Sequence, residues 1–236
     1  MTAPPLIHLT GILKKYQALR PLRLAEFSAG PQDRLVLSGF DAMAAEMFVY
    51  LVTGAALPDE GDVVIAGRNT RDIATDTEWL ASLDRFGIVT HRAILLESTS
   101  VASNMALPLT LAIDPMAPEV RARVDADAAD VGLPTDKLDG PAHALTAAER
   151  VRLHLARALA GGPELLMLEH PTGMLNAPAE STAFGETLRA ISEKRGFGFV
   201  AISEDEAFGK ASGGRRLRLN QKTGKLGGGS GPFGLW

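Results

Sequence analysis

Leu35 to Gly54 reads LVLSGFDAMAAEMFVYLVTG, a short apolar run followed by a glycine and a helix-forming run that ends at a second glycine. The pattern predicts a buried strand over 34–38, a turn at Gly39 and a helix over 42–53. This order is the frame of a phosphate-binding loop, in which backbone N–H groups converge on an anion at the helix N-terminus. The stretch therefore predicts that kind of turn within an α/β fold.

The side chains that bind phosphate are absent from this loop. Its further glycine positions hold Ala42 and Ala44, its lysine position Ala45, and its magnesium-binding hydroxyl position Glu46. Loss of the lysine removes a charge-assisted contact of about 1.5 to 3 kcal/mol. We expect Asp41, as N-cap, and Glu46 to satisfy the helix N-terminus in place of phosphate. Since alanine disfavours positive φ, the loop is also expected to close into additional helix, which Gly54 would cap at its C-terminus.

The composition is that of an ordinary folded protein, with 236 residues, 46% hydrophobic and 22% charged. A net charge of −4 gives no general attraction to nucleic acid or anionic lipid. The absence of cysteine excludes disulfides, thiol catalysis and cysteine-ligated metals, and it suits the cytosol. No segment reaches the length of an apolar membrane span, so we expect any membrane association to depend on another chain.

Strand and helix signals alternate along most of the chain. Short apolar runs predict strands over 7–13, 22–27, 62–66, 86–90, 164–168 and 197–202, and a closing hairpin over 215–226. Helical periodicity fills a block over 98–161 and returns over 178–195, where Gly196 ends it. The pattern predicts a mainly parallel sheet with a small antiparallel β part and an inserted helical subdomain at about 95–160.

The end of the chain has a different composition. Residues 1–226 are expected to form one domain, and residues 227–236 a Gly-rich tail. The tail carries an apolar tip of Phe233, Leu235 and Trp236, which we interpret as a docking peptide for a partner groove.

Several short motifs follow one another in a fixed order. Tyr16 precedes the loop, FGIV at 86–89 precedes His91, and LTAAE at 145–149 precedes LARALA at 155–160. PELLMLEHPTGMLN occupies 163–176, and VAISE occupies 200–204. Together these motifs resemble the nucleotide-binding domain of ABC transporters, and VASNMALPL at 101–109 is similar to ABC systems that handle lipids and lipoproteins. The resemblance implies a P-loop NTPase-like ABC ATPase fold.

The resemblance also implies a counterpart for each part of the family's ATP site. Tyr16 stands where the family has an aromatic residue that stacks on adenine, and His91 replaces its metal-contacting glutamine. Glu169 replaces the magnesium-binding aspartate and His170 the catalytic carboxylate. Glu204 replaces the switch histidine and adds negative charge where a γ-phosphate would lie.

Two of these positions have a structural interpretation as well. Thr146 could offer a hydroxyl to a partner's nucleotide, but Thr-x-x-Glu before an apolar helix is also a capping box with Glu149, which we favour. His170 could act as a base, but we favour a loop histidine bonded to backbone. Asn176, in place of an aspartate, is expected to weaken the coupling between the two sites of a dimer.

The combined losses predict a pseudo-ATPase with no catalytic residue, no metal site and no expected nucleotide. The degenerate counterparts of the cofactor site are Tyr16, Gly39, Ala45, Glu46, His91, Thr146, Glu169, His170 and Glu204. We expect a structural or regulatory subunit that docks to a transmembrane subunit through His91 to Leu109 and pairs with itself or another ABC domain. It would then lie on the cytoplasmic face of a membrane.

Two alternatives remain at this point. The chain could retain binding of ATP and Mg²⁺, or slow hydrolysis, with Tyr16, Glu169 and His170 as the working residues. It could also be an ABC-fold scaffold that binds other proteins outside transport.

Overall fold

A computed structural model of the chain describes residues 4–18 and 20–228. Its strands are β1 (Ile7–Lys14), β2 (Leu22–Ala29), β3 (Arg34–Ser38), β4 (Glu60–Ile65), β5 (Arg68–Asn69), β6 (Phe86–Thr90), β7 (Leu165–Glu169), β8 (Gly198–Ile202), β9 (Arg215–Asn220) and β10 (Lys225–Gly228). Its α-helices are α1 (Ala42–Val52), α2 (Asp76–Leu83), α3 (Val101–Ala106), α4 (Pro118–Val131), α5 (Ala147–Ala160), α6 (Pro178–Arg195) and α7 (Glu206–Ala211). Short 3-10 helices lie at Thr70–Asp72, Thr135–Lys137 and Ala142–Ala144.

The strands form two sheets. The six-stranded sheet has the order β10-β9-β3-β8-β7-β6, and all its neighbours are parallel except β10 and β9. The four-stranded sheet, β2-β1-β4-β5, is antiparallel throughout. This arrangement confirms the expected α/β fold with a mainly parallel sheet and a small antiparallel part.

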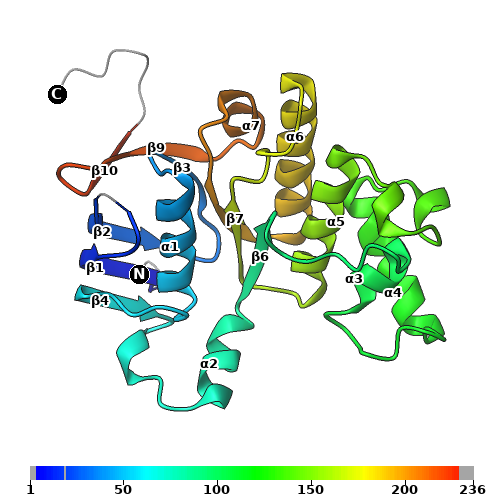
Figure 1. Cartoon of the computed structure of the whole chain (residues 1–236), viewed down its shortest axis with the longest axis horizontal. Helices are drawn as coiled ribbons and strands as arrows, with labels where there is room; N and C mark the ends of the chain where they lie inside the picture. Colours follow the sequence, from blue (N-terminus) through cyan, green and yellow to red (C-terminus); the bar gives the residue numbers. More distant parts are fainter. Residues whose placement is uncertain (1–3, 19, 229–236) are drawn as a thin grey trace.

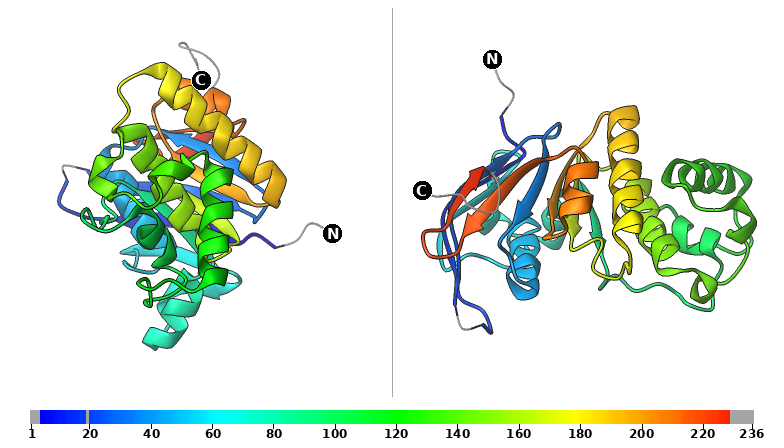
Figure 2. Two further views of the ribbon diagram at one scale, coloured as in Figure 1. Left: turned by 90° about the vertical axis from the view of Figure 1, so that its right-hand side faces the viewer. Right: turned by 90° about the horizontal axis from the view of Figure 1, so that it is seen from above.

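The helices lie in two groups around the larger sheet. In Figure 1 the antiparallel strands and α1 lie at one end of the molecule, and α3, α4 and α5 lie at the other. The right view of Figure 2 keeps these two ends apart, with α6 and α7 between them. Side chains alternate along β3, so that Val36 joins the core under α3 to α7, whereas Leu35 and Leu37 join the core with α1 and the smaller sheet.

Helix α1 begins at the first position after the turn. The Asp41 side chain accepts a hydrogen bond of 2.8 Å from the Ala44 N–H, which confirms Asp41 as N-cap. Ala42 and Ala44 are both helical, as expected for a loop closed into helix. The expected C-cap was wrong by one residue. Thr53 caps the helix because its N–H already bonds to Val49 O, and Gly54 follows it with a φ of 70°.

Sequence signals located most of the other elements. β3, β6 and α6 have the predicted bounds, and the capping box of Thr146 and Glu149 is present at the start of α5. The short helices α2 and α7 were not predicted. β10 includes Gly227 and Gly228, which the sequence assigned to the tail. The apolar tip of Phe233, Leu235 and Trp236 lies outside the described residues.

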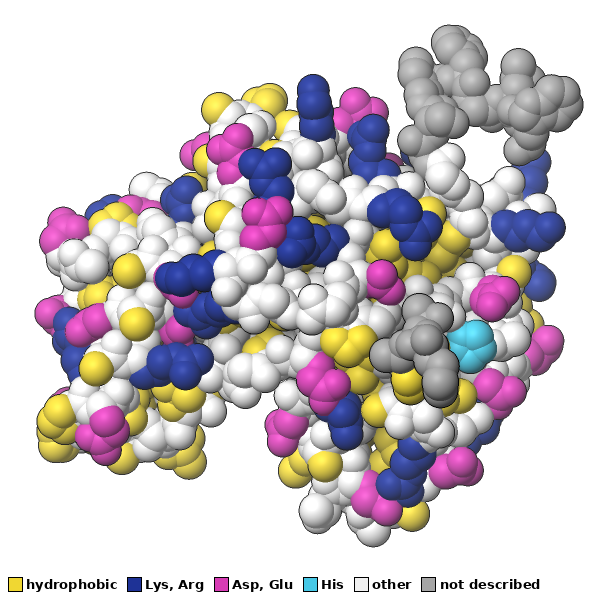
Figure 3. All heavy atoms as spheres, turned by 180° about the vertical axis from the view of Figure 1, so that it is seen from behind, with side chains coloured by type: hydrophobic (Ala, Val, Ile, Leu, Met, Phe, Trp, Pro, Cys, Tyr) yellow, Lys and Arg dark blue, Asp and Glu magenta, His cyan; other side chains and the backbone are white. Residues whose placement is uncertain are grey.

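The surface carries mixed charge. Figure 3 shows basic and acidic side chains interspersed over the face opposite to that in Figure 1. Within residues 4–18 and 20–228, no helix has both the length and the hydropathy needed to cross a bilayer.

Candidate functional site

The turn at Gly39 holds a carboxylate from another strand end. Gly39 has a φ of 87°, and a Cβ at this position would lie 2.5 Å from the Leu219 carbonyl oxygen. The glycine is therefore needed for the close approach of β9 to the turn. The Gly39 N–H donates a short hydrogen bond to Glu204 Oε1, and the Arg218 guanidinium lies 3.9 Å from the other oxygen of Glu204. A backbone N–H that would face phosphate in a phosphate-binding loop is thus bound to the chain's own carboxylate.

The lysine position is part of the hydrophobic core. The Ala45 side chain is 0% exposed and packs in the core that contains Phe48, and Ala44 is 3% exposed. The chain therefore places buried methyl groups where a phosphate-binding loop places a charged amine and a close backbone approach.

The expected role of Glu46 at the helix N-terminus was wrong. Glu46 lies beyond the first turn of α1 and makes no cap; its carboxylate accepts a hydrogen bond of 2.6 Å from the Tyr50 hydroxyl and another from Arg92 Nη1. A full positive charge within hydrogen-bond distance attracts a carboxylate more strongly than the partial charge of a helix end. Only Asp41 satisfies the N-terminus of α1 as the sequence predicted.

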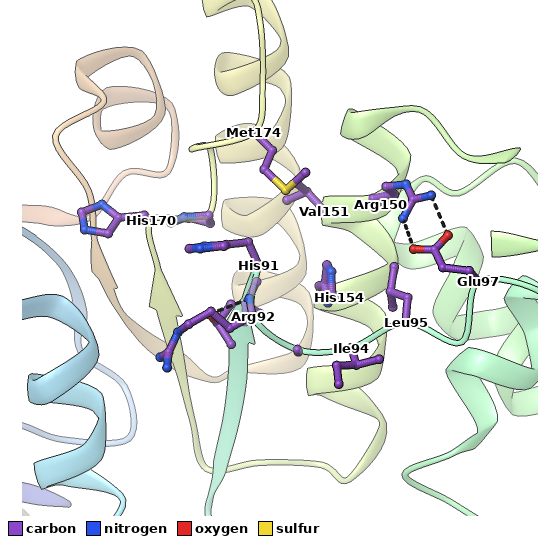
Figure 4. Close-up of a pocket in the computed structure, with 14 residues that line it drawn as sticks. His91, Arg92, Ile94, Leu95, Glu97, Arg150, Val151, His154, His170 and Met174 are labelled. Carbon is purple, nitrogen blue, oxygen red and sulfur yellow. Dashed lines mark hydrogen bonds and ion pairs between the residues drawn. The ribbon is translucent and has the colours of Figure 1, made fainter. Parts of the chain in front are cut away.

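Arg92 is the central residue that the sequence did not reveal. Its Nε lies 3.2 Å from Glu169 Oε1, its Nη2 donates to Glu169 Oε2, and its Nη1 donates to Tyr50 Oη at 2.8 Å. Its Cζ lies 5.3 Å from the centroid of the Tyr50 ring. Figure 4 shows Arg92 directed toward α1, away from the neighbouring His91. One guanidinium therefore joins a carboxylate of α1 to a carboxylate at the end of β7.

The burial of Glu169 explains how strongly its ion pair with Arg92 is held. The Glu169 side chain is 2% exposed, whereas those of Arg92 and Glu46 are 30% and 34% exposed. Burial alone would lower the pKa of Arg92, but hydrogen bonds and charge from Glu169, Tyr50 and Glu46 raise it above its ordinary value. Arg92 is thus a permanent cation between two carboxylates.

A cavity of about 400 Å³ lies beside the ion pair of Arg92 and Glu169. Residues 89–95 and Glu97 line one side, α5 another, and the loop after β7 a third. Arg150 closes one edge through a bidentate pair with Glu97 at 2.7 and 2.8 Å (Figure 4). Burial, aided by the charges of Arg157 and Arg150, lowers the pKa of the His154 imidazole to about 4, so that His154 faces the cavity uncharged at neutral pH.

The two histidines predicted at the site both line this cavity. His91 is exposed on the segment after β6. His170 has a φ of 41°, its N–H bonds to Ile202 O at 2.9 Å, and its ring Nε2 is buried with no hydrogen-bond partner among residues 4–18 and 20–228. The expected backbone bond thus involves the main chain of His170 and not its ring.

Tyr16 and Thr146 lie in different environments. Tyr16 is half-buried against the core that contains Phe48, and burial together with the charge of Asp41 raises the pKa of its hydroxyl. Thr146 lies at the N-cap of α5, where its N–H donates to Glu149 Oε2 at 2.8 Å. Of the nine predicted positions, the structure joins Gly39 to Glu204 by a direct hydrogen bond, and it joins Glu46 to Glu169 through Arg92. Thr146 forms the N-cap of α5, where its side chain takes part in the capping box with Glu149.

Comparisons with known proteins identify the family. The sequence pattern described as "ABC transporter" matches residues 45–173. The chain is 31% identical over 189 residues to the methionine import ATP-binding protein MetN of Xanthomonas oryzae pv. oryzae, and 33% identical over 148 residues to MetN of Photorhabdus laumondii. These alignments cover 80% and 63% of the chain, and it spans about half of the length of the MetN proteins, 54% and 42%. It is 26% identical to the lipoprotein-releasing system ATP-binding protein LolD of Gluconobacter oxydans, with 87% and 90% of the two chains covered.

Solved structures agree in fold. The dimeric post-hydrolysis state of the ATP-binding cassette MJ0796, bound to ADP and Pi, superposes with a TM-score of 0.74 at 20% identity, covering 93% of this chain and 96% of that one. CbiO1 of Clostridium perfringens, part of the cbiONQ transporter complex, gives a TM-score of 0.75 at 17% identity, covering 95% and 87%. The fold is that of P-loop NTPases of the ABC type. The chain belongs to the ABC transporter family.

The residues present do not fit Mg²⁺-ATP, the ligand that the family implies. The Glu204 carboxylate holds the turn amide, Ala45 offers no cation, and the Arg92 guanidinium lies between the carboxylates of Glu46 and Glu169. Within the described ranges, no cluster of three or more His, Asp or Glu side chains is placed to hold a metal ion. The relatives are named as ATP-binding proteins, so the comparisons do not support the expectation that the chain has no nucleotide.

Proposed function

We propose that the chain is a catalytically inactive, ABC ATPase-like subunit with a structural or regulatory role in a membrane transporter-type assembly. The observation that carries this proposal is the carboxylate of Glu204 on the Gly39 N–H, in a turn whose lysine position is the buried Ala45. A carboxylate at this place repels a phosphate instead of binding it. Loss of the lysine alone, at about 1.5 to 3 kcal/mol, weakens nucleotide binding by roughly 10- to 150-fold.

The proposed partner surface is the rim of the cavity within the segment His91 to Leu109. Ile94 is 79% exposed, and Leu96 and Met174 are also large exposed apolar side chains. Ile94 and Met174 line the cavity, beside the uncharged ring of His154. A hollow with an apolar rim suits an amphipathic helix of another chain. We propose that a transmembrane subunit supplies this helix and holds the chain on the cytoplasmic face of a membrane.

We further propose that residues 1–226 act as one ABC-type domain, with a helical subdomain at about 95–160, that pairs with itself or with another ABC domain. In a homodimer both sites would carry Ala45 and Glu204. In a heterodimer the altered loop would affect one site, and Ala147 and Ala148 would affect the other. Either pairing is consistent with a subunit that supports assembly without turning over nucleotide.

A titration of the purified chain with Mg-ATP, with phosphate release measured in parallel, tests the proposal. We expect no saturable binding below the millimolar range and no phosphate release. The matched variant carries Ala42→Gly, Ala44→Gly, Ala45→Lys and Glu46→Ser, and we expect it to regain some phosphate affinity but not hydrolysis. Micromolar affinity of the unmodified chain, or turnover above the background, would favour the alternative of an ABC ATPase that works through Tyr16, Glu169 and His170.

Native purification tests the assembly. Recovery of a membrane subunit supports the transporter-type role, and recovery of soluble proteins alone would favour a scaffold outside transport. Deletion of residues 229–236 tests the proposed docking peptide, because Gly227 and Gly228 belong to β10 and must stay. We expect weaker assembly and an unchanged melting temperature; unchanged assembly would remove the tail from the proposal.

A further inference from the structure

The guanidinium of Arg92 contacts three side chains. The planar guanidinium presents its Nε and Nη2 edge to the two oxygens of Glu169, and its Nη1 to Glu46 and to the Tyr50 hydroxyl. The forked N–H groups of a guanidinium match the two oxygens of a carboxylate better than the single ammonium group of a lysine does. By the resemblance to ABC domains, these two carboxylates stand at the positions that the family implies for its magnesium-binding hydroxyl and aspartate.

We propose that Arg92 is a built-in substitute for the divalent cation of this fold, and that it holds the chain in one arrangement without metal or nucleotide. This inference deepens the proposed function and rests on it. Mg²⁺ requires oxygen ligands in near-ideal octahedral geometry. Here both carboxylate oxygens of Glu169 accept hydrogen bonds from the N–H groups of Arg92. The positive charge of Arg92 neutralises the buried Glu169.

The same residue fixes the segment that lines the cavity. Arg92 ties the start of residues 92–97 to α1 and to the end of β7, and Glu97 ties their end to Arg150 of α5. Between these points Arg157 Nη1 donates to Ile94 O at 2.7 Å, and Leu96 N donates to Asn104 Oδ1 at 2.9 Å. The segment is therefore held along its whole length by the protein's own groups, and the proposed docking rim is formed before any ligand binds.

Replacement of Arg92 provides the test. Arg92→Ala leaves the buried Glu169 without its cation, so we expect the melting temperature to fall by roughly 4 to 12 °C. It also leaves two carboxylates facing one gap, so we expect Mn²⁺, used as a probe alone, to bind and to raise the melting temperature of the variant by roughly 3 to 10 °C at 10- to 100-fold excess over its Kd. With the unmodified chain, the electron paramagnetic resonance signal of free Mn²⁺ should keep its full intensity, and Mn²⁺ should not change the melting temperature.

Arg121→Ala is the matched control. Arg121 also joins two carboxylates, with its Nε 2.8 Å from Asp125 and its Nη1 2.6 Å from Asp139, but these side chains are 47% and 77% exposed, whereas Glu169 is buried. We expect its loss to change the melting temperature by about 2 °C or less, with no gain of Mn²⁺ binding. If Arg92→Ala does not fold, Arg92→Lys keeps the charge and loses the fork. That variant should melt a few degrees lower, exchange amide hydrogens faster over residues 91–97, and bind no Mn²⁺.

The outcomes separate this inference from the proposed function. Mn²⁺ binding to the unmodified chain would overturn the inference even if the chain hydrolyses no ATP. Unchanged stability and exchange in both Arg92 variants would overturn it in the same way. Phosphate release from Mg-ATP by the unmodified chain would instead overturn the proposed function.

Discussion

His154 offers a direct test of the electrostatics of the cavity. Its pKa of about 4 lies below the usual value of 6.5 because the ring, on α5 at the wall of the cavity, is partly buried near the charges of Arg157 and Arg150. The unfolded chain therefore binds a proton that the folded chain rejects between about pH 6.5 and pH 4. The stability that the uncharged His154 ring contributes is therefore fully present above that window and is lost as the pH falls through it. The perturbation is His154→Gln, which removes the titrating group and keeps a polar side chain.

The size of the effect follows from the two pKa values. A fall from pH 7 to pH 5 costs the unmodified chain about 2 kcal/mol through this ring alone. Solvent around the partly exposed ring screens some of this cost, which leaves about 1 to 2 kcal/mol. Carboxylates also titrate near pH 5, but they do so in both proteins. The difference between the unmodified chain and His154→Gln therefore isolates the ring.

Urea denaturation followed by circular dichroism at pH 7 and pH 5 measures this difference. We expect the free energy of unfolding to fall by about 1 to 2 kcal/mol more in the unmodified chain than in His154→Gln. His143→Gln is the matched control, since it makes the same replacement at an exposed histidine outside the cavity lining. Parallel pH profiles for the unmodified chain and His154→Gln would refute the burial argument.

Three further substitutions test other contacts. Gly39→Ala should cost about 2 to 4 kcal/mol in urea denaturation, because its Cβ meets the Leu219 carbonyl at a positive φ; a cost below about 1 kcal/mol would mean that β9 moves away freely. Glu204→Gln should speed amide exchange at Gly39 about fivefold, since a charged hydrogen bond is weakened by about 1 kcal/mol, and unchanged exchange would deny that bond. Arg195→Ala should cost about 1 to 2 kcal/mol in thermal unfolding, because it takes one of two cations from Asp127, which is 3% exposed and keeps its pair with Arg123; unchanged unfolding would contradict this.

Local signals made most of the fold predictable. The bounds of β3, β6 and α6 follow from apolar runs and from Gly196, and the caps at Asp41 and Thr146 follow from side chains next to the helices that they start. The short helices α2 and α7 were missed because a helix of six or eight residues shows barely two turns of periodicity.

The contacts of the candidate site were less predictable because they join distant parts of the chain. Arg92 lies 46 residues from Glu46 and 77 from Glu169, and nothing beside Arg92 in the sequence points to either acid. Glu204 lies 165 residues from Gly39. The available signal was an excess of carboxylates at positions that should bind phosphate and metal, since buried acids require a cation from somewhere.

The mutual dependence of Arg92, Glu46 and Glu169 has an evolutionary consequence. Replacement of any one of the three leaves at least one of the other two with an unmatched charge, and for the buried Glu169 this is costly. Sequences that keep this arrangement are therefore expected to keep the three residues together or to replace them together.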